Sequence, residues 1–125
     1  PSGNTNYTPS NAPAEISIVN ADGSSTIPTR LAANDPAACT GVASPGLTNS
    51  WPKWAPNTTT VGTRTFYWLT FSSKRNDGTT PQLFVTPVVI DSGTMKTYPA
   101  LYLWNQLTDE GNHTPAWDNF QIPIS

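Results

Sequence analysis

The sequence predicts an all-β fold of antiparallel strands, and three observations support this. Thirteen prolines are spread along the 125 residues, and each one removes a backbone donor and disfavours helix at the residue before it. No window repeats apolar residues with the i, i+3, i+4, i+7 spacing of an amphipathic helix over three turns. Short runs rich in β-branched and aromatic residues alternate instead with clusters of turn-forming residues.

The N-terminal region is expected to be an extended arm that leads into one domain. Residues 1–14 hold almost nothing that a core could bury, so we expect them to lie extended. A single β domain of propeller-blade-like repeats then covers residues 15–125. Five Trp, four Tyr and four Phe supply ample material for its core.

A first hairpin is predicted directly after the arm. Residues 15–23 alternate apolar and polar side chains, with both isoleucines facing inward, and end on an Asp-Gly turn. Residues 27–32 are the expected partner strand. Residues 33–49 are rich in Pro, Gly and Ala, and we expect a long loop there.

The strongest strand signal lies in the middle of the chain. Residues 65–75 are the best strand candidate, and the Asn-Asp-Gly sequence at 76–78 is the best turn candidate. Residues 82–91 follow as the hairpin partner. Because proline cannot donate to a strand ladder, we expect Pro87 to lie at an edge or a bulge of that strand.

The remaining segments are expected to be shorter. Residues 57–64 are predicted to form a loop, and residues 92–99 to turn the chain into a strand at 100–104. Another loop is predicted at 107–115, and residues 116–124 form a last extended piece. Neighbouring strands are expected to meander.

Two stretches of the chain share one design. Residues 15–31 and 82–103 each contain an alternating strand, a turn of small residues and a second strand entered after a proline. A loop and then Pro-x-Trp follow each stretch, at Pro52–Trp54 and at Pro115–Trp117. Repetition of a strand unit is typical of propellers and solenoids, in which one unit cannot bury its own face.

The central part of the sequence resembles the TolB-type β-propeller repeat. Each blade of that family opens with Pro-x-Trp-Ser-Pro-like residues, continues through a Phe-Ser-Ser-x-Arg strand, and closes on a Gln-led strand and a turn. The matching residues here are Pro52, Trp54, Pro56, Phe71, Ser72, Ser73, Arg75, Gly78, Gln82, Leu83 and Val85. The sequence departs from the pattern in two places: Ala replaces Ser after Trp54, and residues 56–63 (PNTTTVGT) stand where the family has Pro-Asp-Gly. These departures leave the length of the first hairpin open.

The resemblance implies about one complete blade flanked by partial blades. It also implies that the Pro-x-Trp residues pack between neighbouring blades, with Trp54 and Trp117 in equivalent positions. The residues expected at the contacts between blades are Pro52, Trp54, Phe71, Pro115 and Trp117. A closed propeller needs at least four blades, or roughly 160 residues. We therefore expect a homo-oligomer or a part of a larger propeller, with the arm, including Tyr7, added to a neighbour as a strand.

Residues with catalytic or metal-binding chemistry are few. The chain has one His and one Cys, so neither an internal disulfide nor a His-based metal cage can form. Ser72, His113 and Asp118 could make a Ser-His-Asp set on paper, but no Gly-x-Ser-x-Gly elbow accompanies them. Residues 109–112 offer two or three oxygens without EF-hand spacing. We expect no catalytic residue, metal or cofactor.

Composition narrows the partners and the compartment. The six Lys and Arg are scattered and the net charge is −2, which disfavours a nucleic-acid surface. No apolar run approaches the roughly 20 residues of a membrane span. Few charges and abundant Thr and Ser suit an exported protein, so we expect the extracellular space, the cell surface or the periplasm.

Three functions remain open. The first is a non-enzymatic interaction module that assembles with its own copies or with the rest of a propeller, for example as a component of a filament. The second is a carbohydrate-binding module that stacks sugars on exposed tryptophans; the contact candidates are Tyr7, Trp51, Trp68 and Trp104. The third is a remnant of a hydrolase, which rests on fold analogy alone.

Overall fold

The fold is all-β and antiparallel, as the sequence predicts. The computed structural model describes residues 14–36 and 48–118, so Tyr7 and most of the expected arm lie outside it. The elements in chain order are β1 (Ser17–Ile18), β2 (Thr29–Arg30), η1 (Ala32–Asn34), β3 (Asn49–Trp54), β4 (Thr59–Val61), β5 (Arg64–Ser73), β6 (Gln82–Asp91), β7 (Thr94–Thr97) and β8 (Leu101–Tyr102). β1 and β2 form a two-stranded sheet, and the other six strands form a second sheet.

The centre of the larger sheet is the hairpin of β5 and β6. Their ten residues pair without interruption, from Arg64 opposite Asp91 to Ser73 opposite Gln82. The predicted turn between them is confirmed: Gly78 adopts a φ of +80° and donates its N–H to the carbonyl of Lys74 at 2.7 Å. Strong β-formers on both strands explain why this hairpin could be predicted nearly to the residue.

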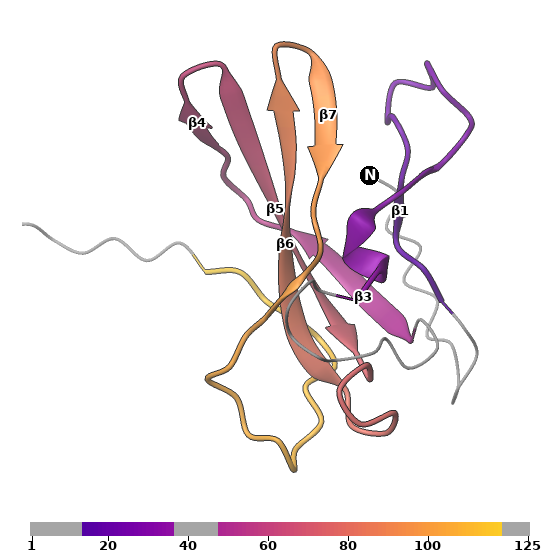
Figure 1. Ribbon diagram of the computed structural model, residues 1–125, viewed down its shortest axis with the longest axis vertical. Helices are drawn as coiled ribbons and strands as arrows, with labels where there is room; N and C mark the ends of the chain where they lie inside the picture. The colour runs from indigo at the N-terminus through magenta and orange to yellow at the C-terminus, as the bar shows by residue number, and fades with distance from the viewer. Residues whose placement is uncertain (1–13, 37–47, 119–125) are drawn as a thin grey trace, which may run out of the picture.

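The sheet is four strand positions wide and has the order of a meander. β3 and β4 both pair with β5, while β7 and β8 both pair with β6, so each outer position is shared by two short strands. In Figure 1 the β4–β5 and β6–β7 turns lie at one end of the sheet, and the orange-to-yellow loop after β8 extends from the other. This arrangement is consistent with a blade-like sheet.

Two strands were not expected. β4 lies in the predicted loop and β7 in the predicted turn, and each is formed by a hairpin with a two-residue connection. Gly62 takes a φ of +62° in the first connection, and Ser92 and Gly93 take +49° and +83° in the second. Positive φ values of this kind match the right-handed twist of the flanking strands.

Pro87 lies in a central strand rather than at a sheet edge. It is opposite Trp68 on β5, and β6 has partners on its other side as well. Those partners change from β7 to β8 at this point, because β7 pairs only from Val88 onward and β8 pairs only up to Val85. The missing N–H of the proline therefore faces a gap in the ladder.

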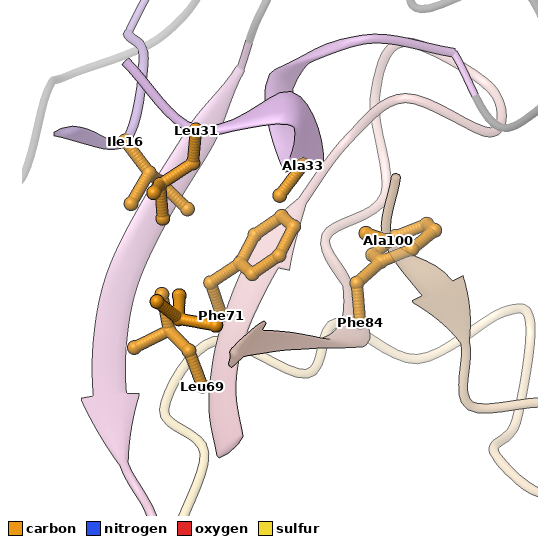
Figure 2. Packing of buried hydrophobic residues seen from close by; sticks show 8 residues of the cluster. Ile16, Leu31, Ala33, Leu69, Phe71, Phe84 and Ala100 are labelled. Carbon is orange, nitrogen blue, oxygen red and sulfur yellow. The ribbon is translucent and has the colours of Figure 1, made fainter. Parts of the chain in front are cut away.

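The core lies between the first hairpin and one face of the sheet, which we call the inner face. Figure 2 shows Ile16, Leu31 and Ala33 directed toward Phe71 and Phe84. Phe71 is fully buried, and its ring stacks on that of Phe84 with the centroids 5.9 Å apart. The remaining buried members of this cluster are Leu69, Val88 and Ala100.

Candidate functional site

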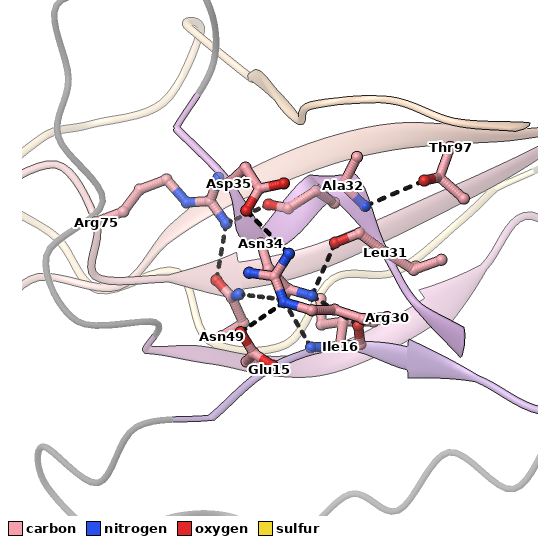
Figure 3. A network of polar contacts seen from close by, with 11 residues as sticks. Glu15, Ile16, Arg30, Leu31, Ala32, Asn34, Asp35, Asn49, Arg75 and Thr97 are labelled. Carbon is pink, nitrogen blue, oxygen red and sulfur yellow. Dashed lines mark hydrogen bonds and ion pairs between the residues drawn. The ribbon is translucent and has the colours of Figure 1, made fainter. Parts of the chain in front are cut away.

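A buried asparagine is at the centre of the hydrogen bonds that attach the first hairpin to the sheet. Asn34 is fully buried at the end of η1; its Oδ1 accepts the N–H of Ile16 at 2.7 Å, and its Nδ2 donates to the carbonyls of Ile16 and Leu31. The amide of Asn49 on β3 donates to the same Oδ1 at 2.9 Å (Figure 3). One side chain therefore joins the two sheets.

Arg75 extends this network from the other side. Its Nη2 donates to the carbonyl of Ala33 and to Oδ1 of Asn49, both at 2.8 Å. Its guanidinium carbon lies 5.2 Å from the ring centre of Phe71 and 4.7 Å from that of Phe84, within cation–π range. Burial lowers the pKa of Arg75 to about 10, so the group remains a cation at neutral pH.

The residues predicted to pack between blades lie in different environments. Phe71 is in the core, whereas Trp54 ends β3 and makes an edge contact with Tyr67 at 6.5 Å. Pro115 is buried, and the indole N–H of Trp117 donates to the carbonyl of Lys53 at 3.1 Å. Trp117 belongs to no strand, so within the described residues the two Pro-x-Trp motifs are not equivalent. The second motif packs on the first.

Trp51 and Pro52 form a bulge in β3. Ser50 pairs with Ser72 and Lys53 with Thr70, which leaves two residues of β3 opposite Phe71 alone. Trp51 has a φ of +53°, a strained backbone for a bulky residue. Its half-buried ring lines a shallow hollow of about 270 Å³ together with Pro52, Lys53, Thr114 and Pro115.

Trp68 lies on the other face of the sheet, which we call the outer face. Its ring stacks on Phe66 with the centroids 6.3 Å apart. The register also places Leu83, Val85, Pro87, Val89 and Leu101 on this face. Leu83, Val85 and Pro87 are half-buried, Val89 is buried, and Leu101 is 60 % exposed.

Trp104 is the most exposed large apolar residue among the part of the chain that the structure describes. It is 82 % exposed and follows β8 in a loop over residues 103–112, where Leu107 is 61 % exposed. Exposed apolar side chains on a protein surface usually occur singly. Here Leu101, Leu103, Trp104 and Leu107 occur within seven residues, and we call them the apolar segment.

Two glutamines hold the backbone of this loop. The side chain of Gln106 accepts the N–H of Leu83 on β6 at 2.8 Å and donates to the carbonyls of Leu83 and Leu103. Gln82 is buried, and its Nε2 donates to the carbonyls of Leu107 and Glu110. The loop is therefore fixed on the sheet while its apolar side chains face water.

Sequence reasoning named Trp104 as a contact candidate but not the groups that hold the loop after it. The bonds that join Gln82 to Leu107 and Glu110, and Gln106 to Leu83, link residues 23 to 28 positions apart and run to backbone groups that no local pattern reveals. Asn34 and Asn49 were missed for the same reason. Arg75 and Gln82 were noted only as matches to a repeat pattern.

The Ser-His-Asp set considered from sequence does not assemble. Ser72 is fully buried in β5, and its hydroxyl donates to the carbonyl of Asn112 at 2.9 Å. His113 and Asp118 are exposed, and in the described part of the chain neither forms a hydrogen bond to Ser72. Within residues 14–36 and 48–118, no group of three His, Cys, Asp or Glu side chains could hold a metal ion.

The acidic turn residues make local hydrogen bonds. Oδ1 of Asp77 accepts the N–H groups of Thr79 and Thr80 at 2.8 and 2.7 Å, which lowers the pKa of Asp77 to about 2. The Thr63 hydroxyl and Arg64 lower the pKa of Asp91 in the same way. These contacts stabilise turns and create no reactive carboxylate.

No helix within the described ranges is long and apolar enough to cross a membrane.

Comparison with known proteins gives no relative: no protein-family model, no curated protein and no solved structure matches the chain significantly. The resemblance to the TolB-type repeat therefore stays a prediction from the residues.

Proposed function

We propose that this chain is an exported, non-enzymatic protein-interaction module that pairs with its own copies or completes a larger β assembly. The observation that carries the proposal is the apolar segment, whose side chains face water on a loop that Gln82 and Gln106 fix in place. A fixed apolar loop loses little conformational entropy when it binds, so the burial of Trp104 contributes directly to affinity.

The shape of the sheet supports assembly with further sheets. Its inner face is already covered by the first hairpin, through Ile16, Leu31 and Ala33. Its outer face carries the row that contains Trp68 and Pro87. A sheet that stacks on a neighbour through one face and offers apolar residues on the other is what a blade of a propeller requires. Because of these two faces, we propose completion of a TolB-like propeller as one form of this assembly.

Site-specific photo-crosslinking tests the proposal. Benzoylphenylalanine at position 104 is expected to form protein adducts, either with a second copy in the pure protein or with another protein in an extract of the source organism. Position 27 is the matched control, because Ile27 is 78 % exposed but lies in the first hairpin, away from the apolar segment. Equal adduct yields at the two positions, or none at either, would contradict an interaction surface at Trp104.

A second candidate function is supported by the hollow at Trp51. An indole ring flanked by Pro52 and Pro115, with the hydroxyl of Thr114 beside it, has the mixture of apolar platform and polar group that a sugar ring requires. Retention on a polysaccharide affinity gel should be lost in Trp51→Ala and kept in Trp104→Ala. Retention that survives Trp51→Ala rules out this site.

A further inference from the structure

The hollow at Trp51 is bounded on one side by the bulge of β3. The carbonyl of Lys53 accepts the hydroxyl of Thr70 at 3.3 Å and the indole N–H of Trp117 at 3.1 Å, and these two bonds fix the backbone beside the bulge. Trp51 itself has a φ of +53°, a conformation that costs free energy in a bulky residue. Because strained residues of this kind cluster at ligand-binding sites, the bulge itself indicates a site.

The other side of the hollow is formed by Thr114 and Pro115. The carbonyl of Asn112 accepts the hydroxyl of the buried Ser72 at 2.9 Å, and the N–H of Asn112 donates to the carbonyl of Pro81 at 2.8 Å. The stretch that leads into this wall is therefore attached to the sheet, which reduces the conformational entropy that binding costs. The volume of about 270 Å³ is below the roughly 300–1,000 Å³ of pockets for drug-sized ligands, so the hollow suits a single ring.

We infer that the ligand of this hollow is a sugar ring that carries a carboxylate, a uronic acid residue, with its ring on Trp51 and its carboxylate beside Lys53. The inference rests on the second candidate function, because it names the class of sugar that the same hollow binds. Trp51, Pro52 and Pro115 supply the apolar surface that the C–H face of a sugar ring covers. The hydroxyl of Thr114 both donates and accepts hydrogen bonds, as a sugar hydroxyl requires of its partner.

The choice of an acidic sugar follows from Lys53. Its side chain lines the hollow and is exposed. A lysine at an apolar surface lays its carbon stem along that surface and keeps its ammonium in water, which places the charge at the rim. The ion pairs within residues 14–36 and 48–118 involve Arg30, Arg64 and Lys96, and Lys53 forms none with any carboxylate there, Asp118 included. A carboxylate on the ligand would complement this charge, and a neutral sugar would not.

Titration of the ¹⁵N-labelled chain with short uronic acid oligomers, followed by the amide NMR shifts of Lys53 and Thr114, tests this inference. Oligomers of galacturonate, mannuronate and glucuronate are the probes, because together they vary the configuration of the ring. The methyl ester of each oligomer is the matched ligand, since it keeps the ring and removes the charge. At about 0.05 M salt, at least one acid should bind about two- to fivefold more tightly than its ester, as expected of an exposed ion pair. The difference should shrink at about 0.5 M salt.

Single variants assign the effect to the hollow. Lys53→Gln should remove the preference for the acid and leave binding of the ester unchanged. Lys96→Gln is the matched control, because it removes the same charge from β7 at the opposite edge of the sheet, and it should keep the preference. Both lysines are exposed, so both variants should fold, which unchanged melting temperatures verify. Trp51→Ala should abolish binding of acid and ester alike.

The outcomes separate the inference from the second candidate function. Equal affinities for every acid and its ester, or a Lys53→Gln variant that keeps the preference, overturn the acidic ligand. If affinities are equal and Trp51→Ala abolishes binding, the sugar site stands and its preference for a carboxylate does not. If no oligomer binds in either form, the sugar site and the inference both fail, whereas the interaction surface at Trp104 is unaffected.

Discussion

Replacement of Asn34 by Ala should weaken the attachment of the first hairpin to the sheet. The substitution removes an amide that is fully buried and makes four hydrogen bonds. The carbonyls of Ile16 and Leu31 keep a backbone partner each, from Leu31 N–H and Asn34 N–H respectively. The N–H of Ile16 and the amide of Asn49 lose the bonds that Asn34 supplied.

The expected loss of stability follows from those two donors. A buried donor left without a partner costs about 1–3 kcal/mol, so the two donors together should lower the free energy of unfolding of Asn34→Ala by about 2–6 kcal/mol. For a domain of this size, each kcal/mol corresponds to a change in melting temperature of roughly 3–5 °C. A decrease of about 6–30 °C is therefore expected.

Thermal and urea unfolding, followed by circular dichroism, measure this loss. Asn20→Ala is the matched control, because within residues 14–36 and 48–118 the amide of Asn20 bonds to Ser24 alone, in an exposed turn; it should change stability by less than about 0.5 kcal/mol. If Asn34→Ala falls within the same small range as Asn20→Ala, the network does not hold the hairpin and the reasoning is wrong.

Three further predictions concern single positions. Asp77→Asn should flatten the dependence of stability on pH between about 4 and 2. The pKa of Asp77 in the folded chain lies below its unfolded value, so the carboxylate stabilises the fold above pH 4, and this contribution is lost as the pH falls toward 2. Urea midpoints at pH 2, 4 and 7 measure the change in stability. Gly93→Ala should destabilise the β6–β7 hairpin by about 1–2 kcal/mol, because φ at Gly93 is +83°. Ala21→Gly in an exposed turn is its control and should change the melting temperature little, and equal melting temperatures for the two variants would contradict this reasoning. Gln106→Ala should speed hydrogen exchange at the Leu83 amide, and unchanged exchange there would show that Gln106 does not hold the loop.

The strands that could be predicted are those that are specified by residues close together in the sequence. The bounds of β5 and β6 were predicted to within two residues, because β-branched and aromatic residues fill both strands and a strong turn joins them. β4 was missed because Thr59, Thr60 and Val61 are all exposed, so no alternation marks the strand. β7 was missed because Ser92 precedes Gly93 in place of the Asn that usually signals such a turn.

The candidate site could be predicted only in part. Trp104 was named as a contact candidate at the end of the strand expected at 100–104; it lies beyond β8 and is exposed, whereas Trp51 is half-buried and Trp68 stacks on Phe66. The clamp by Gln82 and Gln106 depends on the folded register of β6 and could not be read from spacing. The two Pro-x-Trp motifs suggested equivalent places in a repeat, whereas the fold brings the second against the first.

Fluorine NMR of the chain labelled with 5-fluorotryptophan, at about 10 and 500 µM, tests the central claim most directly. Single Trp→Phe variants assign the five resonances. The account predicts that the Trp104 resonance shifts, either with concentration in the pure protein or on addition of an extract of the source organism, while those of Trp54 and Trp117 do not. Five resonances that stay unchanged under both conditions would contradict it.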